Sequence, residues 1–225
     1  MVGEELLGSL PPDWQYTTLG NACARGSGDV QTGPFGSQLH ASDYVAKGVP
    51  IVNPTHIDAD RIQHTDIPKI SELDADRLQR HKLRTGDILF SRRGDVGRHA
   101  HVFEEEEGWL CGTGCLIVRP CQAKIYPLYL SYLLSTSSAQ EYLKSHAVGS
   151  IMPNINTKVL AAVPVAVPAY EDQLKIAELF CSLDGRIQYA IVKCDTLKSL
   201  FSSMLHLLMT GQVRVNNLRI EEVGK

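Results

Sequence analysis

The sequence predicts an α+β protein, with one mixed α/β globular domain followed by a long C-terminal coiled-coil helix. Through the first 169 residues, short apolar runs alternate with turns that contain glycine or proline, which is typical of strands mixed with short helices. The following 40 residues contain no proline and repeat apolar residues at helical spacing. We therefore expect a globular domain over residues 1–169, a long helix over 170–210 and a tail over 211–225.

The N-terminal part of the domain begins with an entry turn at Pro11–Trp14, and we expect Trp14 and Leu19 to be its first core residues. Val49–Val52 has the composition of a short strand. Residues 58–70 are polar and predict a loop.

A helix is predicted at Ser71–Arg80, because Ser71 can cap its first turn and Asp74 supplies an acid at the third helical position. Pro127–His146 predicts a second helix, since proline is tolerated in a first turn. Gly149–Asn156 predicts a polar loop. We expect further strands at Ile88–Phe90, His99–Phe103, Trp109–Cys111, Cys115–Val118 and Leu160–Val167.

The long helix carries a continuous apolar seam with alternating steps of four and three residues. Its members are Ile176, Phe180, Leu183, Ile187, Ala190, Cys194, Leu197, Phe201, Met204 and Leu208. At 1.5 Å per residue this helix is roughly 50 Å long, more than one domain of this size covers. The sequence therefore favours dimerisation through the seam, with an antiparallel register that places large residues opposite small ones. A core helix packed on its own domain is the alternative.

Composition restricts the class of protein. No apolar run approaches the roughly 20 residues that span a bilayer, so no membrane partner is expected. The first 12 residues carry Glu4 and Glu5 but no basic segment, unlike a signal peptide, which predicts a cytoplasmic protein. The six cysteines show no C-x-x-C pair and are expected to be reduced. His99 and His101 are too weak a pattern to predict a metal site, so none is expected.

Positive charge is concentrated in one segment although the formal net charge is −3. Residues 77–98 contain seven Lys or Arg and two Asp. Such a segment can be a solvated surface or can contact nucleic acid, and composition alone leaves both open.

Three loops rich in Gly, Ser, Asn and Arg suit recognition: residues 32–40, 91–98 and 149–158. Arginine can bind guanine edges, and Asn or Gln can bind adenine. The candidate DNA-contacting residues are Ser37, Gln38, His40, Arg92, Arg93, Arg98, Asn154, Asn156 and Lys158. Each could instead stabilise a turn. Gly33, Gly36 and Gly94 are expected to shape the loops rather than touch DNA.

Motifs of catalysis are missing from the sequence. Asn53-Pro54-Thr55-His56 lacks the second proline and the stacking aromatic of an adenine-methyltransferase turn, and no glycine-rich loop follows a first strand to hold a methyl donor. No E-x-K follows Pro12-Asp13, and no nucleophile-elbow, phosphate-loop or zinc-protease motif occurs. We therefore expect no catalytic residues and no cofactor.

Several segments together resemble the target recognition domain of type I restriction–modification specificity (S) subunits. They are Gly33–Ser37, Gly48–Asn53, Gly86–Gly94 and Ile151–Asn156. Val163–Pro168, Asp172–Ala177 and Leu208–Val213 resemble that family's transition into its spacer helix. The resemblance runs in order through nearly the whole chain.

The resemblance implies a non-catalytic subunit whose recognition domain reads one half of a split target in the major groove of double-stranded DNA. It also implies docking of modification (M) subunits, which methylate adenine with S-adenosylmethionine. Motor and nuclease (R) subunits could join for cleavage.

The chain departs from the family pattern because it carries one recognition domain and one helix instead of two of each. Met1 and the typical ending favour a half-S subunit over a random fragment. Two copies would rebuild a pseudo-complete subunit and read an inverted repeat. One alternative is a non-catalytic regulatory protein that binds the methyltransferase. Another is a fragment of a fused methyltransferase–nuclease.

Overall fold

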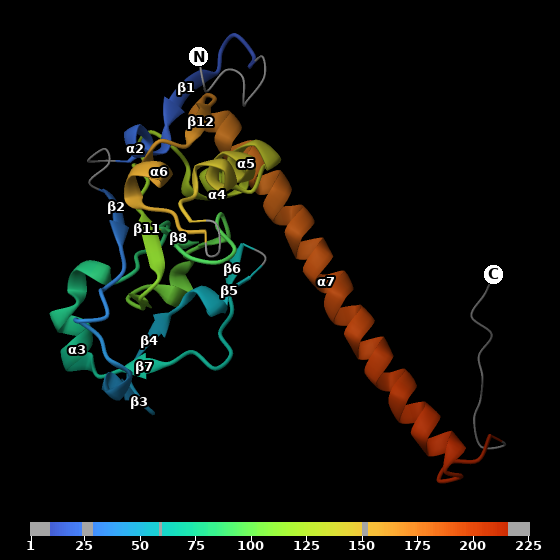
Figure 1. Ribbon diagram of the computed structural model, residues 1–225. Helices are drawn as coiled ribbons and strands as arrows, with labels where there is room; N and C mark the ends of the chain where they lie inside the picture. The colour runs from blue at the N-terminus through green and yellow to red at the C-terminus, as the bar shows by residue number, and fades with distance from the viewer. Residues whose placement is uncertain (1–9, 24–28, 59, 150–152, 216–225) are drawn as a thin grey trace. The chain divides into compact units, whose positions relative to one another are not determined.

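The computed structural model describes residues 10–23, 29–58, 60–149 and 153–215, and confirms the α+β class (Figure 1). Contacts divide the chain into two compact units, Met1–Ala177 and Glu178–Lys225. The first unit therefore extends into the long helix, eight residues beyond the expected boundary at residue 169. No helix in the described ranges combines the length and hydropathy needed to cross a bilayer.

The central sheet of the first unit has four antiparallel strands in the order β2 (Val30–Thr32), β11 (Cys115–Val118), β8 (Ile88–Ser91) and β9 (His99–His101). Every residue of β8, β9 and β11 is buried. Predicted strands at these positions are confirmed, although β9 ends two residues early because a 3-10 turn begins after Phe103.

A second four-stranded sheet has the order β10 (Leu110–Cys111), β4 (Val49–Val52), β7 (Lys69–Ile70) and β3 (Tyr44–Val45). β10 and β4 are parallel, and the other neighbours are antiparallel. β4 has the predicted bounds.

The predicted loop over residues 58–70 is wrong. β5 (Ile57–Asp58) and β6 (Arg61–Ile62) form a hairpin there, before β7. The sequence signal is weak because each strand contributes one buried isoleucine and one polar residue.

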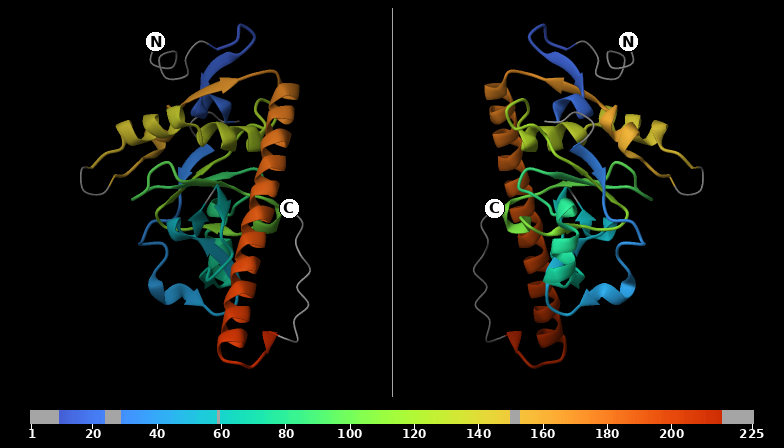
Figure 2. Two further views of the ribbon diagram at one scale, coloured as in Figure 1. Left: turned by 90° about the vertical axis from the view of Figure 1, so that its right-hand side faces the viewer. Right: turned by 90° about the vertical axis from the view of Figure 1, so that its left-hand side faces the viewer.

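β1 (Gln15–Thr18) and β12 (Pro164–Val167) form an antiparallel pair beside α2 (Leu19–Ala22) and α6 (Thr157–Ala161). These elements lie at one end of the unit, and β3, β4 and β7 lie at the other (Figures 1 and 2). The single strand predicted over Leu160–Val167 is wrong in its first part. Asn156 caps a helix there, because its Oδ1 accepts hydrogen bonds from the two backbone N–H groups of Lys158 and Val159.

The helix predicted over Pro127–His146 is interrupted. α4 (Pro127–Leu134) and α5 (Ser137–His146) are separate, with Ser135 and Thr136 between them. The hydroxyl groups of Ser135 and Thr136 donate to backbone oxygens in the last turn of α4. Such bonds offer the chain an alternative to the regular helix ladder, which explains the break.

α3 (Glu72–Arg77) follows the predicted pattern closely. Ser71 Oγ accepts a hydrogen bond of 3.1 Å from Asp74 N, as expected of the N-cap. The helix ends three residues earlier than predicted. Short 3-10 turns complete the unit at Ala41–Asp43 (η2), Pro54–His56 (η3), Gln79–His81 (η4) and Glu104–Glu106 (η5).

α7 (Tyr170–Met209) is one continuous helix, which confirms the prediction for the C-terminal part (Figure 1). Its first turns belong to the first unit, where Gln173 and Ala177 are fully buried. Gln173 Oε1 accepts from Tyr126 N at 2.7 Å, and its Nε2 donates to Pro168 O at 3.0 Å and to Lys124 O at 3.5 Å. All three partners are main-chain atoms.

The second unit exposes most of the predicted seam. Ile176 differs, because it lies in the first unit and packs half-buried against its core, and Leu208 is also half-buried. Ile187 is 54% exposed, Leu197 55% and Phe201 68%. Apolar residues off the seam, namely Tyr189, Val192 and Leu200, are also exposed. Exposed apolar surface on this scale is typical of a surface that binds a partner.

Gly33→Ala is expected to destabilise the first unit by about 1–3 kcal/mol, the usual range for forcing atoms into a packed site. A Cβ on Gly33 would lie 2.2 Å from Gly112 O. Strands β2 and β10 end immediately before Gly33 and Gly112, which limits how far either backbone can move. Gly36→Ala is the matched control, because a Cβ there would meet nothing within 4 Å. Urea denaturation measures both variants. Equal stability for the two would contradict the close approach.

Candidate nucleic-acid interface

The strand register brings two of the three predicted loops to one end of the central sheet. Cys115 pairs with Ser91, and Thr32 pairs with Leu116. The end of β2, the end of β8 and the start of β11 therefore lie side by side. Gly33 N donates to Cys115 O at 2.9 Å, which fixes where the first loop leaves the sheet.

The third predicted loop (residues 149–158) is hydrogen-bonded to the second, which follows β8 and is called the basic turn below (residues 91–98). Ile155 N donates to Arg92 O at 3.0 Å, and Gly94 N donates to Pro153 O at 3.2 Å. Arg92 Nε also donates to Asn154 Oδ1 at 3.2 Å. Two segments about 60 residues apart in the chain thus form one surface containing predicted residues from both loops.

Arg93 is the most accessible arginine of this surface. Its side chain is exposed, and no hydrogen bond or ion pair joins its guanidinium group to another residue in the described ranges. Its backbone forms an isolated bridge with Asn154. A free guanidinium fork held on a fixed backbone suits contact with a base edge or a phosphate group.

Other predicted residues have structural tasks or lie apart. Gln38 Oε1 accepts from Phe35 N at 3.1 Å and closes its own turn. Asn156 caps α6. Arg98 is half-buried, and its buried Nε has no hydrogen-bond partner among the described residues. Ser37, His40 and Lys158 are exposed. No hydrogen bond recorded between described residues links Ser37, Gln38 or His40 to the Arg92–Asn154 pair.

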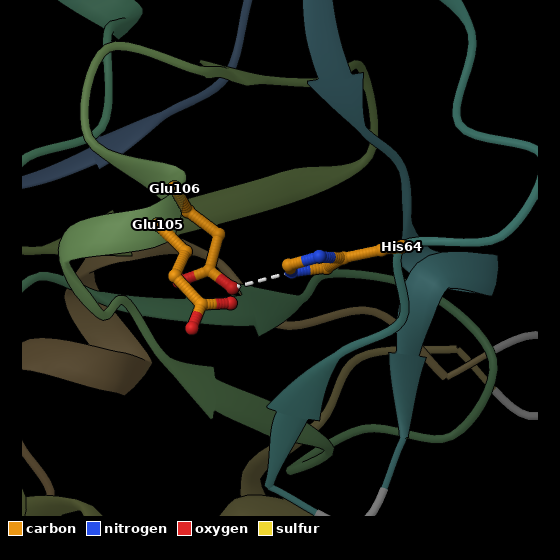
Figure 3. A group of neighbouring side chains, drawn as sticks. All are labelled: His64, Glu105 and Glu106. Carbon is orange, nitrogen blue, oxygen red and sulfur yellow. Dashed lines mark hydrogen bonds and ion pairs between the residues drawn. The ribbon is translucent and has the colours of Figure 1, made fainter.

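A group of possible metal ligands is formed by residues outside the three predicted loops (Figure 3). His64, Glu105 and Glu106 offer ligand atoms within 4.8 Å of one another, and their side chains point toward one another. Glu106 is already engaged, because its Oε1 lies 2.7 Å from His64 Nε2 and its Oε2 accepts from Phe103 N at 2.7 Å. Glu106 thus closes the turn that begins at Phe103 and is hydrogen-bonded to His64. The absence of a metal stays a prediction.

The chain matches the family model of the type I restriction modification DNA specificity domain over residues 13–193. Curated relatives include the MjaVIII specificity subunit of Methanocaldococcus jannaschii, which is 23% identical over 94% of this chain and 49% of the relative. The EcoBI specificity subunit of Escherichia coli is 24% identical over 92% of this chain and 44% of the relative. The chain thus spans about half the length of these relatives.

The fold is also similar to that of solved structures. The HsdS subunit from Thermoanaerobacter tengcongensis matches with a TM-score of 0.60 and 19% identity, over 97% of this chain and 54% of that chain. A chain from a study of assembly and conformational transition of the type I R-M system matches with a TM-score of 0.61 and 17% identity, over 95% and 53%. Fold and sequence define a specificity-type recognition domain. The chain belongs to the type I restriction–modification DNA specificity family.

Proposed function

We propose that this chain is a half-length specificity subunit that reads one half of a bipartite target in double-stranded DNA. The observation that carries the proposal is the joining of the basic turn to the third loop through Arg92 and Asn154 at one end of the central sheet. Arginine and asparagine are the residue types that read guanine and adenine edges in the major groove. The family relationship supports the same reading.

In this proposal a second copy of the chain supplies the other recognition domain. The chain spans about half of its relatives, and the exposed seam of α7 supports a homodimer. In a dimer with two-fold symmetry, both recognition domains would read the same sequence on opposite strands. The expected target is an inverted repeat with a fixed gap.

The methyltransferase partner is proposed to dock on α7 as well. The exposed residues Tyr189, Val192 and Leu200 lie off the seam, so pairing of two helices through the seam would leave them uncovered. In this proposal the M subunits bind S-adenosylmethionine and transfer the methyl group, R subunits join for cleavage, and this chain contributes no catalysis and no cofactor.

Arg93→Ala is expected to weaken binding to the target by about 1–3 kcal/mol if its guanidinium fork reads a base. Fluorescence anisotropy with target duplexes altered at single base pairs measures the change. The variant should discriminate less between base pairs at one position of the target. Arg84→Ala is the control, since it removes an exposed positive charge from the turn at the opposite end of β8. Unchanged affinity and unchanged preference would remove Arg93 from the interface.

The experiment that tests the function is a map of N6-methyladenine in DNA from cells that express this chain with its methyltransferase. We expect N6-methyladenine within a gapped inverted repeat. This methylation should be lost when the chain is not expressed. An asymmetric split site would replace the homodimer by a pair of different half-subunits. A map that does not depend on the chain would favour the alternative of a regulatory protein that binds the methyltransferase without a DNA site of its own.

A further inference from the structure

Asn154 is bridged on both sides, to the basic turn and to the segment that follows α5. It forms one antiparallel bridge with Arg93 and another with Val148. Val148 N donates to Asn154 O at 2.9 Å, and Asn154 N donates to Val148 O at 3.0 Å. On the other side, the main-chain hydrogen bonds of Arg92 and Gly94 flank the pair of Arg93 and Asn154. Main-chain bonds therefore fix the position of all three bridged residues.

This register places three side chains in one row. Residues directly opposite each other in antiparallel segments project their side chains from the same face. Arg93, Asn154 and Val148 thus follow one another across three adjacent segments. At the usual spacing of neighbouring strands, the outer two are roughly 10 Å apart, which corresponds to about three successive base pairs of DNA. Val148 extends the row formed by two residues that the sequence already proposes as DNA contacts.

Val148 is 66% exposed. A single exposed valine is ordinary on a protein surface, so its exposure by itself indicates nothing. Its register gives the exposure a meaning, because the neighbouring members of the row are polar residues suited to base edges. A valine side chain also has few rotamers, so little conformational entropy is lost when it makes a contact.

The surroundings of Val148 suit a nucleic acid better than an apolar protein surface. Within the described residues of segments 91–98 and 127–161, it is the one large apolar side chain that is exposed. Lys144 lies in the last turn of α5 and Lys158 in the first turn of α6, and both are exposed. Neither lysine forms an ion pair with another described residue. Such lysines are available for phosphate groups on either side of the row.

We propose that Val148 is a specificity-determining residue that contacts the C5-methyl group of a thymine, beside the bases contacted by Asn154 and Arg93. This methyl group is the apolar feature that a T·A pair presents in the major groove, and cytosine lacks it. Contact would remove the apolar surface of both groups from water. Val148 would thereby favour thymine over cytosine at one position of the half-site. The inference rests on the proposed function, because it requires that this surface reads DNA.

The test removes the methyl group from the DNA instead of changing the protein fold. Each thymine of the mapped target is replaced in turn by deoxyuridine, which differs only by that methyl group. The target contains thymine, because every methylated adenine pairs with one. Affinity of the full chain, with its methyltransferase present, is measured by fluorescence anisotropy. We expect replacement at one position of each half-site to weaken binding about fourfold, the usual effect of one apolar carbon group left unburied.

Val148→Ala should bind the thymine duplex about fourfold more weakly and should no longer respond to deoxyuridine at that position. The main-chain bonds of Val148 do not depend on its side chain, so this variant should keep the native fold. Val45→Ala is the matched control. It makes the same change at another exposed valine, in β3, and should keep the native response to deoxyuridine.

Three outcomes would overturn the contact. The native chain could bind every deoxyuridine duplex as tightly as the thymine duplex. Val148→Ala could keep the native response, which would mean that its side chain only supports the fold. Val45→Ala could lose the response as well, which would make the effect unspecific. Each of these leaves the proposed function standing, provided that the native chain selects the mapped target over an unrelated duplex. Absence of that selection would overturn the proposed function and the contact together.

Discussion

Leu197→Asp is expected to dissociate the proposed homodimer into monomers. Leu197 is a seam residue of α7 and 55% exposed within the single chain, so a partner helix would bury it. A carboxylate at this point would be buried without a partner, which costs about 3–5 kcal/mol. Two-fold symmetry places one such charge on each helix and doubles the penalty. Leu183→Asp should act in the same way. Light scattering of the purified chain measures the mass.

Ser199→Asp is the matched control for these variants. Ser199 is exposed, lies two residues from Leu197 and is not part of the seam. The same new charge should leave the dimer intact there. A native chain that already scatters as a monomer would refute the homodimer, and a dimeric Leu197→Asp variant would move the interface away from the seam.

Acidification from pH 6.5 to pH 4 is expected to lower the free energy of unfolding. Burial, and to a lesser extent the positive charge of Arg61, lower the pKa of His101 to about 4. Burial and then Arg80 lower the pKa of His81 to about 4. Because the folded-state pKa values are depressed, this stability is present above pH 6.5 and is lost as the pH falls toward 4. Each imidazole contributes at most about 3 kcal/mol.

Asp87 acts in the opposite direction in the same range. Burial raises the pKa of its carboxyl group from 3.8 to about 6, although the nearby Arg119 lowers it. Its contribution is therefore fully present below pH 3.8 and is lost as the pH rises through 6. The net loss on acidification should be smaller than the two imidazoles would give alone.

Urea denaturation at pH 6.5 and pH 4 measures this effect. His101→Leu should reduce the pH dependence, because a leucine takes up no proton when the chain unfolds. His146→Gln is the control, since His146 is exposed. A free energy of unfolding that stays constant between these two pH values would show that the buried imidazoles do not govern the acid response.

The elements that could be predicted from the sequence are those specified by local interactions. α7 begins at the predicted residue and ends one residue before the predicted end, because its apolar period is local and uninterrupted. α3 begins as predicted because Ser71 caps it. The break between α4 and α5 depends on hydroxyl groups that reach back to α4, and composition does not reveal such bonds. The β5–β6 hairpin was missed because its strands are two residues long.

The sequence also predicts part of the candidate interface, namely the part that depends on local sequence. Glycines and arginines mark the basic turn in the sequence, but the bond between Arg92 and Asn154 joins residues 62 positions apart. Gln38 and Asn156 look like base-reading residues in the sequence, whereas their side chains stabilise the local backbone.

The attachment of α7 through Gln173 tolerates substitutions at the residues that Gln173 contacts. The amide of Gln173 bonds to Tyr126 N, Lys124 O and Pro168 O, which are main-chain atoms present whatever side chains those positions carry. Substitutions elsewhere in the domain that keep this backbone geometry leave the hydrogen bonds of Gln173 intact. The same helix could therefore carry a domain with different loops without any change in the contacts of Gln173.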